Sequence, residues 1–257
     1  MEGSQYQSAL IVGAGEGLSA SLARLFARER MRVALAARHT DKLGELCREI
    51  GANAFVCDAA QPDQVRRLFA EVEQDIGAPD VVVYNASARA RGPFVDLAAS
   101  DVEQTLAVSA FGGFLVAQQA VRRMLPKRHG AVLLTGASAS VKGYAQSAPF
   151  AMGKFALRGL AQSMARELAP LGIHVAHFVI DGAIRNPGRV EPADKPGSML
   201  DPDAIAASYL HVLSQPRSAW MGDRAQTLDR EILIPPSSSK ASYCECRLRR
   251  HSPGLVP

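Results

Sequence analysis

The chain has 257 residues and a mass of 27.4 kDa, a length that suits one large α/β domain and is short for two. Hydrophobic residues make up 47% and charged residues 21%, and no uncharged apolar run is long enough to span a bilayer. The net charge of +4 is spread along the chain, so we expect neither a nucleic-acid nor a membrane partner. The first residues carry no basic or apolar signal segment, which predicts a cytoplasmic protein.

The segment over residues 9–38 predicts a strand, a glycine turn, a helix and a second strand. Residues 9–12 form a short apolar run, residues 18–26 carry leucines and a phenylalanine at helical spacing, and apolar character returns over residues 33–37. In a parallel βαβ unit the turn lies at the carboxyl edge of the sheet, facing the N-terminus of the helix. Free N–H groups at that helix end favour a pyrophosphate, so the segment predicts a dinucleotide site.

Three glycines in the turn have separate expected roles. Gly13 permits the tight turn, and Gly15 or Gly17 lets phosphate oxygens approach the backbone. Ser19 is small enough for close packing of the helix on the strand.

The end of the second expected strand indicates which dinucleotide binds. A dinucleotide fold that prefers NAD usually places an acid there, whereas this chain has Ala37 followed by Arg38, which can pair with a 2′-phosphate. Arg38 therefore favours NADP. Glu16 in the glycine turn has the opposite effect, because a carboxylate would repel that phosphate, and NAD stays open.

The rest of the chain alternates strands and helices. Strands are expected over residues 54–57, 81–84, 131–135 and 173–180, and helices over residues 41–50, 61–76, 101–125, 150–168 and 201–213. This alternation predicts a doubly wound, Rossmann-type parallel sheet in a single domain over residues 1–234. The apolar period fails from Pro235 onward, so residues 235–257 are expected to form a disordered tail.

No metal site is indicated. The four cysteines lack the spacing of a zinc site and are expected to be free thiols. His174 and His177 lie three apart on an expected strand, so their side chains would point to opposite faces.

Over roughly residues 9–213 the chain resembles the short-chain dehydrogenase/reductase family. The matching positions follow the family's order, each at the end of a strand. The glycine motif comes first, with Ser19 in place of the family's third glycine, and Asp58 falls at the position that holds the adenine ring. Asn85-Ala86 then resembles the family's Asn-Asn-Ala-Gly, and Asp181-Gly182 resembles its Pro-Gly. The resemblance implies a nicotinamide coenzyme held by Gly13, Gly15, Gly17, Leu18, Arg38, Asp58, Asn85, Ala86, Lys154, Gly182 and Ile184.

The resemblance is incomplete at the catalytic residues. The family's Tyr-x-x-x-Lys aligns with Phe150 and Lys154; in the family the tyrosine protonates the carbonyl oxygen while the lysine lowers its pKa and holds the nicotinamide ribose. Phe150 has no proton to give. The family's serine corresponds to Ser138, or by strict spacing to Ala137, and its helix asparagine corresponds to Ser109.

Two functions follow from this pattern. In the first, the protein transfers hydride to or from a small, apolar carbonyl, alcohol or activated alkene, with a proton from Tyr144, from Lys154, or from a water held by Ser138 and Ser109. A lost general acid costs about 10²–10⁴-fold, so turnover would be reduced without vanishing. In the second, the protein binds NADP(H) without turnover, as a sensor or partner subunit.

The resemblance also implies a homodimer or homotetramer that pairs through the helices expected over residues 101–125 and 150–168. The loop over residues 184–200 is expected to be the substrate lid.

Overall fold

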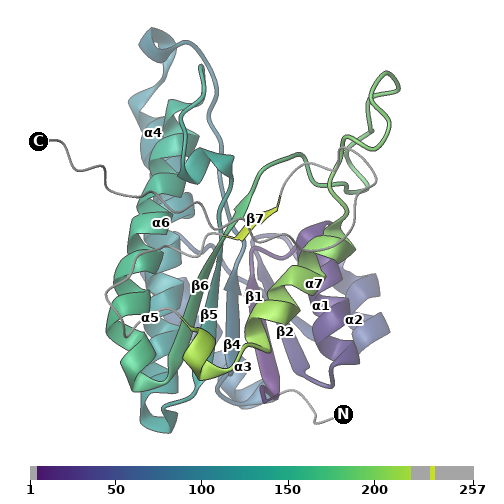
Figure 1. The fold of residues 1–257 in the computed structure, drawn as a ribbon, viewed down its shortest axis with the longest axis vertical. Helices are drawn as coiled ribbons and strands as arrows, with labels where there is room; N and C mark the ends of the chain where they lie inside the picture. The colour runs from purple at the N-terminus through teal and green to yellow at the C-terminus, as the bar shows by residue number, and fades with distance from the viewer. Residues whose placement is uncertain (1–4, 221–231, 235–257) are drawn as a thin grey trace, which may run out of the picture.

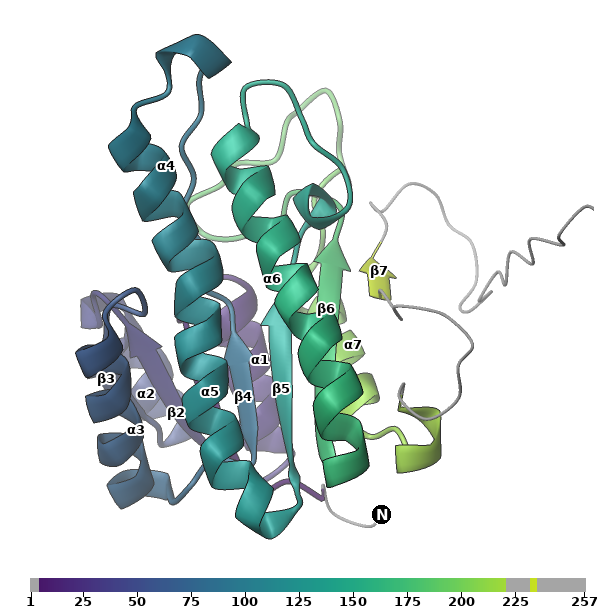
Figure 2. The same cartoon turned by 90° about the vertical axis from the view of Figure 1, so that its left-hand side faces the viewer.

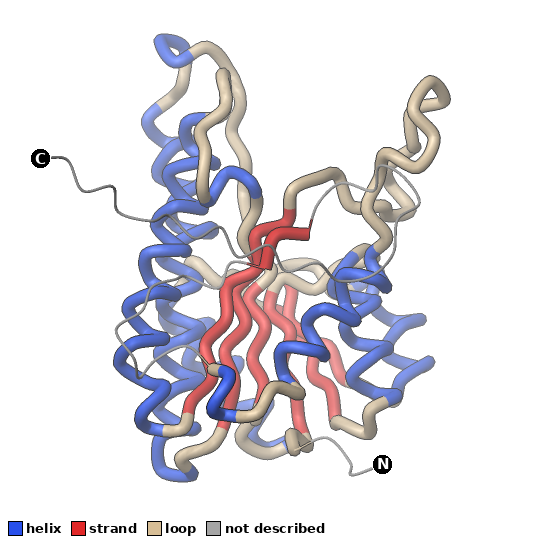
Figure 3. Tube along the Cα trace, in the orientation of Figure 1, coloured by secondary structure: helices blue, strands red, loops and turns tan. Residues whose placement is uncertain are grey.

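The computed structural model describes residues 5–220 and 232–234, and its centre is a parallel sheet with the strand order β3-β2-β1-β4-β5-β6-β7 (Figures 1 and 3). The strands are β1 (Ser8–Val12), β2 (Arg32–Ala37), β3 (Asn53–Val56), β4 (Val81–Tyr84), β5 (Gly130–Thr135), β6 (Ile173–Ile180) and β7 (Ile232–Ile234). Chain order reverses between β1 and β4, which opens a crevice at their carboxyl ends. The expected doubly wound fold is confirmed.

Helices cover both faces of the sheet (Figures 1 and 2). They are α1 (Leu18–Arg28), α2 (Gly44–Ile50), α3 (Pro62–Ile76), α4 (Ala99–Leu106), α5 (Gly112–Met124), α6 (Ala148–Leu168) and α7 (Pro202–Leu213). Two apolar layers result: α1, α2 and α7 pack on one face, and α3, α5 and α6 on the other. Within β1, Leu10 and Ile11 are both fully buried and belong to different layers, as expected of a strand covered on both sides. In the described part of the chain, no helix combines the length and the apolar character needed to cross a membrane.

The single helix expected over residues 101–125 is interrupted. A π-helical turn, Ala107–Phe111, separates α4 from α5. The cause lies on β4, where the buried Tyr84 hydroxyl donates a hydrogen bond to the Val108 carbonyl and so inserts into the helix. Gly112 lets the helix come this close, because a Cβ there would lie 2.5 Å from the Tyr84 hydroxyl oxygen.

The seventh strand was not expected from the sequence. Residues 232–234 pair in parallel with residues 178–180 of β6. Three apolar residues are too few to show a period, so only the neighbouring strand defines this element. The expected tail over residues 235–257 lies outside the described residues.

Replacing Gly172 with alanine is expected to destabilise the fold more than the same change at Gly51. Both glycines have positive φ, 85° and 66°, so a side chain costs about 1–3 kcal/mol of backbone strain at either position. At Gly172 the added Cβ would also lie 2.2 Å from the Arg128 carbonyl oxygen, whereas at Gly51 nothing lies within 4 Å. In urea denaturation, Gly172→Ala should lose at least about 2 kcal/mol more than Gly51→Ala. Equal losses of stability in the two variants would contradict the close approach of Gly172 to the Arg128 carbonyl.

Candidate functional site

The glycine turn after β1 is packed against the end of β4. Gly13 has φ 87°, and a Cβ there would lie 2.3 Å from the Ala86 backbone nitrogen. The Ser19 hydroxyl donates to the Gly13 carbonyl at 3.1 Å and accepts from the Asn85 amide at 2.7 Å. Ser19, expected from the sequence to stand in place of the family's third glycine, therefore joins the turn to the β4 end, which adds a role to the small size expected of it.

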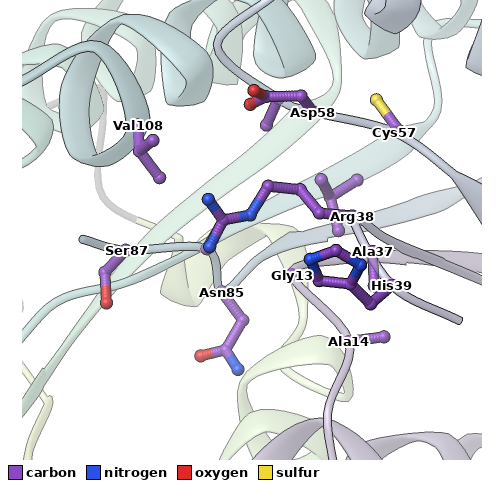
Figure 4. A pocket seen from close by; sticks show the side chains of 13 residues that line it. Gly13, Ala14, Ala37, Arg38, His39, Cys57, Asp58, Asn85, Ser87 and Val108 are labelled. Atoms are coloured by element: carbon purple, nitrogen blue, oxygen red, sulfur yellow. The ribbon is translucent and has the colours of Figure 1, made fainter. Parts of the chain in front are cut away.

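A pocket of about 300 Å³ lies over the ends of β1 to β4 (Figure 4). Five residues expected to hold the coenzyme line it: Gly13, Arg38, Asp58, Asn85 and Ala86. Arg38 and His39 are exposed, and the Arg38 guanidinium extends across the pocket toward Ser87 (Figure 4). Arg38 forms no ion pair with a carboxylate in the described ranges, so its donors are available to a ligand. Sequence reasoning did not single out His39, although it directly follows Arg38.

The other residues expected at the coenzyme lie outside the lining of this pocket: Gly15, Gly17, Leu18, Lys154, Gly182 and Ile184. A Cβ on Gly15 would meet nothing within 4 Å, so the backbone there is open to a ligand. A Cβ on Gly17 would lie 3.3 Å from the Asn186 Cβ, which places the loop after β6 against the glycine turn. Gly182 packs on Leu200 in the same loop.

Phe150 and Lys154 lie in the first turns of α6, and both are buried, at 6% and 3% exposed. The Lys154 Nζ lies 5.8 Å from the centre of the Phe150 ring and donates to the Thr135 carbonyl at 2.7 Å. Burial, together with the positive charge of Arg89, lowers the pKa of Lys154 to about 7. The Thr135 hydroxyl shares a hydrogen bond of 2.9 Å with the Tyr209 hydroxyl of α7. The lysine is therefore held at a set position and can exchange its proton near neutral pH.

The serines after β5 have different surroundings. Ser138 is partly exposed, and in the described part of the chain its hydroxyl has no hydrogen-bond partner. Ser140 is fully buried; its hydroxyl accepts from the Ala137 backbone at 3.2 Å and lies 3.5 Å from the His177 Nε2. Ser138 is the serine that remains available to a substrate.

Ser109 and Tyr144 are engaged elsewhere. Ser109 is fully buried in the π-helical turn, and its hydroxyl accepts from the Ala88 backbone at 3.1 Å. Tyr144 is 46% exposed, with its ring 5.6 Å from the Lys142 Nζ. Among the described residues neither hydroxyl forms a hydrogen bond with the Lys154 amine.

Sequence reasoning also missed Arg89, whose guanidinium carbon lies 4.1 Å from the centre of the Phe150 ring. The loop after β4 carries it to the expected catalytic position. The available signal was the alternation of Arg89 and Arg91 a few residues beyond Asn85, but only the folded chain shows that Arg89 faces Phe150.

The chain is similar to known proteins over most of its length. The family model described as short chain dehydrogenase matches residues 7–188. Sorbitol-6-phosphate 2-dehydrogenase of Escherichia coli is 27% identical over 248 residues, covering 93% of this chain and 94% of the relative. The 3-oxoacyl-[acyl-carrier-protein] reductase MabA of Mycobacterium avium is 29% identical and covers 69% of this chain and 67% of the relative.

Solved structures of short-chain dehydrogenases and of a ketoreductase share the fold of this chain. A short-chain type dehydrogenase/reductase from Mycobacterium marinum superposes with a TM-score of 0.76 at 28% identity, covering 89% of this chain and 93% of that one. An actinorhodin polyketide ketoreductase with NADPH gives 0.75 at 22% identity, covering 83% and 92%. The latter likeness concerns the fold alone.

Lys154 is expected to make the free energy of unfolding depend on pH. Its pKa is about 7 in the folded chain against an ordinary 10.5, so between these values the unfolded chain binds more protons and stability rises with pH. The rise approaches about 1.4 kcal/mol per pH unit. Urea denaturation of the wild type and Lys154→Met at about pH 7 and about pH 8.5 measures it. The wild type should gain stability relative to the variant at the higher pH; an unchanged difference would show that Lys154 stays charged in the fold.

Proposed function

Because the chain belongs to the short-chain dehydrogenase family, we propose that it is an NADP(H)-dependent oxidoreductase acting on a small carbonyl, alcohol or activated alkene. The observation that carries the proposal is the combination of the pocket at the β1–β4 crevice with a buried Lys154 of near-neutral pKa at the head of α6. A structural lysine would be expected at the surface, whereas this amine is held in the interior by the Thr135 carbonyl.

The residues around the glycine turn fit a dinucleotide with a 2′-phosphate. The open space beside Gly15 admits phosphate oxygens, and the fork of Arg38 suits a phosphate in bidentate contact. His39 adds a second donor next to it. Glu16, the residue expected to oppose NADP, is not part of the pocket lining.

The coenzyme, when bound, supplies or accepts the hydride. For the proton, Lys154 is the best supported of the three sources considered from the sequence, because Tyr144 lies exposed beside Lys142 and the Ser109 hydroxyl is bound to Ala88. In carbonyl reduction, the oxygen would take its proton from the Lys154 ammonium, leaving a neutral amine that a second proton from solvent restores. Ser138 would orient the substrate oxygen.

A second candidate is binding of NADP(H) without turnover, and Phe150 favours it. The sequence resemblance aligns it with the family's tyrosine; its ring is buried and has no acidic proton. The Lys154 amine behind it is almost closed to solvent. The two candidates share the coenzyme site and differ only in the chemistry at α6.

A homodimer or homotetramer remains part of the proposal. Four large apolar side chains are exposed on α5, the π-helical turn and α6: Phe111, Phe114, Met152 and Phe155. Phe111 and Phe114 stack on each other with ring centres 6.3 Å apart. A second copy that covered these side chains would remove them from water.

Arg38→Glu is expected to weaken NADPH binding by about 10- to 100-fold or more while changing NADH binding little, because only NADPH carries the phosphate that Arg38 would contact. Fluorescence titration of both coenzymes measures this. Arg32→Glu is the matched control: it makes the same charge change at the opposite end of β2 and should leave both affinities unaltered. If Arg38→Glu lowered the affinities for NADPH and NADH equally, Arg38 would not be the residue that binds the 2′-phosphate.

Phe150→Tyr is expected to raise carbonyl reduction by about 10²–10⁴-fold, since the new hydroxyl would lie beside Lys154 on the same face of α6. NADPH oxidation with a panel of aldehydes, ketones and enones measures the change. Phe150→Leu removes the ring without adding a hydroxyl and should show no rise. A wild type that binds NADPH but is silent across the panel would support the second candidate.

A further inference from the structure

Arg89 lies beside the expected catalytic position, and Arg91 and Arg189 are two positive charges that act on it; we call the three residues the arginine cluster. Arg89 and Arg91 follow β4, and Arg189 lies in the loop between β6 and α7. Figure 1 shows these two segments rising above the carboxyl end of the sheet on opposite sides. The guanidinium carbon of Arg89 lies 4.1 Å from the centre of the Phe150 ring.

The Arg189 guanidinium donates to a neutral group, the Ile184 carbonyl, at 3.0 Å. Within the described ranges, none of the three arginines forms an ion pair with a carboxylate. In the segment after β6 that carries Arg189, Asp181 pairs with Lys142 at 3.4 Å, and Glu191 accepts from the Met199 backbone at 3.1 Å.

The positive charges act on one another. Partial removal from water lowers the pKa of Arg89, and the charges of Arg91 and Arg189 lower it further. Arg89 in turn helps to lower the pKa of Lys154 behind the Phe150 ring. Like charges placed this close repel each other, and an anion bound among them would relieve the repulsion.

The loop after β4, which carries Arg89 and Arg91, is held in place by hydrogen bonds from its backbone. The Ser109 hydroxyl accepts from the Ala88 backbone, directly before Arg89. Gly92 donates from its backbone to the Gln146 carbonyl at 3.2 Å. A guanidinium that stacks by its face on an aromatic ring keeps its N–H edge free to bind an anion.

We propose that the substrate is an anion, with a carboxylate or phosphate group close to the reacting carbon, and that Arg89 binds this group with help from Arg91 and Arg189. The inference rests on the proposed function, since it assigns the substrate of that same site. A guanidinium over the Phe150 ring favours an anionic substrate over the apolar one expected from the sequence. None of the cluster lines the pocket around Arg38, so the anion is distinct from the 2′-phosphate assigned there.

The test uses the full chain saturated with NADP⁺ and two matched pairs of small carbonyl compounds in calorimetric titrations. Benzoylformate is compared with its neutral amide, and dihydroxyacetone phosphate with dihydroxyacetone. The first pair measures the contribution of a carboxylate to binding, and the second pair measures that of a phosphate. In at least one pair the anion should bind about 10-fold or more tightly than its neutral partner. In Arg89→Gln that preference should fall by about 10- to 100-fold, because a charge-assisted bidentate contact is lost. Arg89→Lys keeps the positive charge but cannot make a bidentate contact, so its preference for the anion should lie between that of the wild type and that of Arg89→Gln.

The matched control is Arg122→Gln, which removes an exposed arginine from the last turn of α5 and should leave the preference intact. NADP⁺ affinity should be the same in all of these proteins. Equal binding of charged and neutral partners, no binding by either anion, or a preference that survives in Arg89→Gln would overturn the inference. So would an anion that displaces NADP⁺ instead of binding beside it. Failure of NADP⁺ itself to bind would instead count against the proposed function.

Discussion

The candidate site depends on the two hydrogen bonds of the Ser19 hydroxyl. One joins it to the Gly13 carbonyl and the other to the Asn85 amide, so the turn after β1 and the end of β4 are fixed to each other at the point where strand order reverses. The pocket lined by Gly13, Arg38, Asp58, Asn85 and Ala86 lies around this junction. A glycine at position 19 would permit the same close packing, but it would leave the amide and the carbonyl without this shared partner.

Much of the fold could be predicted because the underlying interactions are local or periodic. The bounds of β4 and β6 were predicted to the residue, since Val81–Tyr84 and Ile173–Ile180 are apolar runs with clear breaks at either end. Arg38, Asp58 and Asn85 could be expected in one pocket because the carboxyl ends of parallel strands meet at one edge. The features that were missed depend on contacts between distant parts of the chain. The π-helical turn follows from the Tyr84 hydroxyl, and Arg89 becomes part of the site only when its loop folds over Phe150.

The sequence resemblance aligns Phe150 with the family's tyrosine, and the side chains expected to act beside it are present in the fold. Lys154 is buried and bonded, Ser138 is partly exposed, and the position above the Phe150 ring is taken by a cation. Under the proposed function, the site would hold a positive charge near the ring in place of the tyrosine hydroxyl. Positive charge can bind a substrate or stabilise a developing oxyanion without itself giving up a proton.

The Lys154 amine is also connected to the far side of the sheet. Its partner is the Thr135 carbonyl, and the Thr135 hydroxyl bonds the Tyr209 hydroxyl on α7, which packs on the opposite face from α6. The Tyr209 ring in turn stacks on Phe178 of β6. Substitutions that repack the apolar layer beneath α7 would therefore shift Tyr209 and Thr135, and with them the position of the Lys154 amine. The requirement to keep that amine in place would limit which residues this layer can accept, although the layer is remote from any ligand.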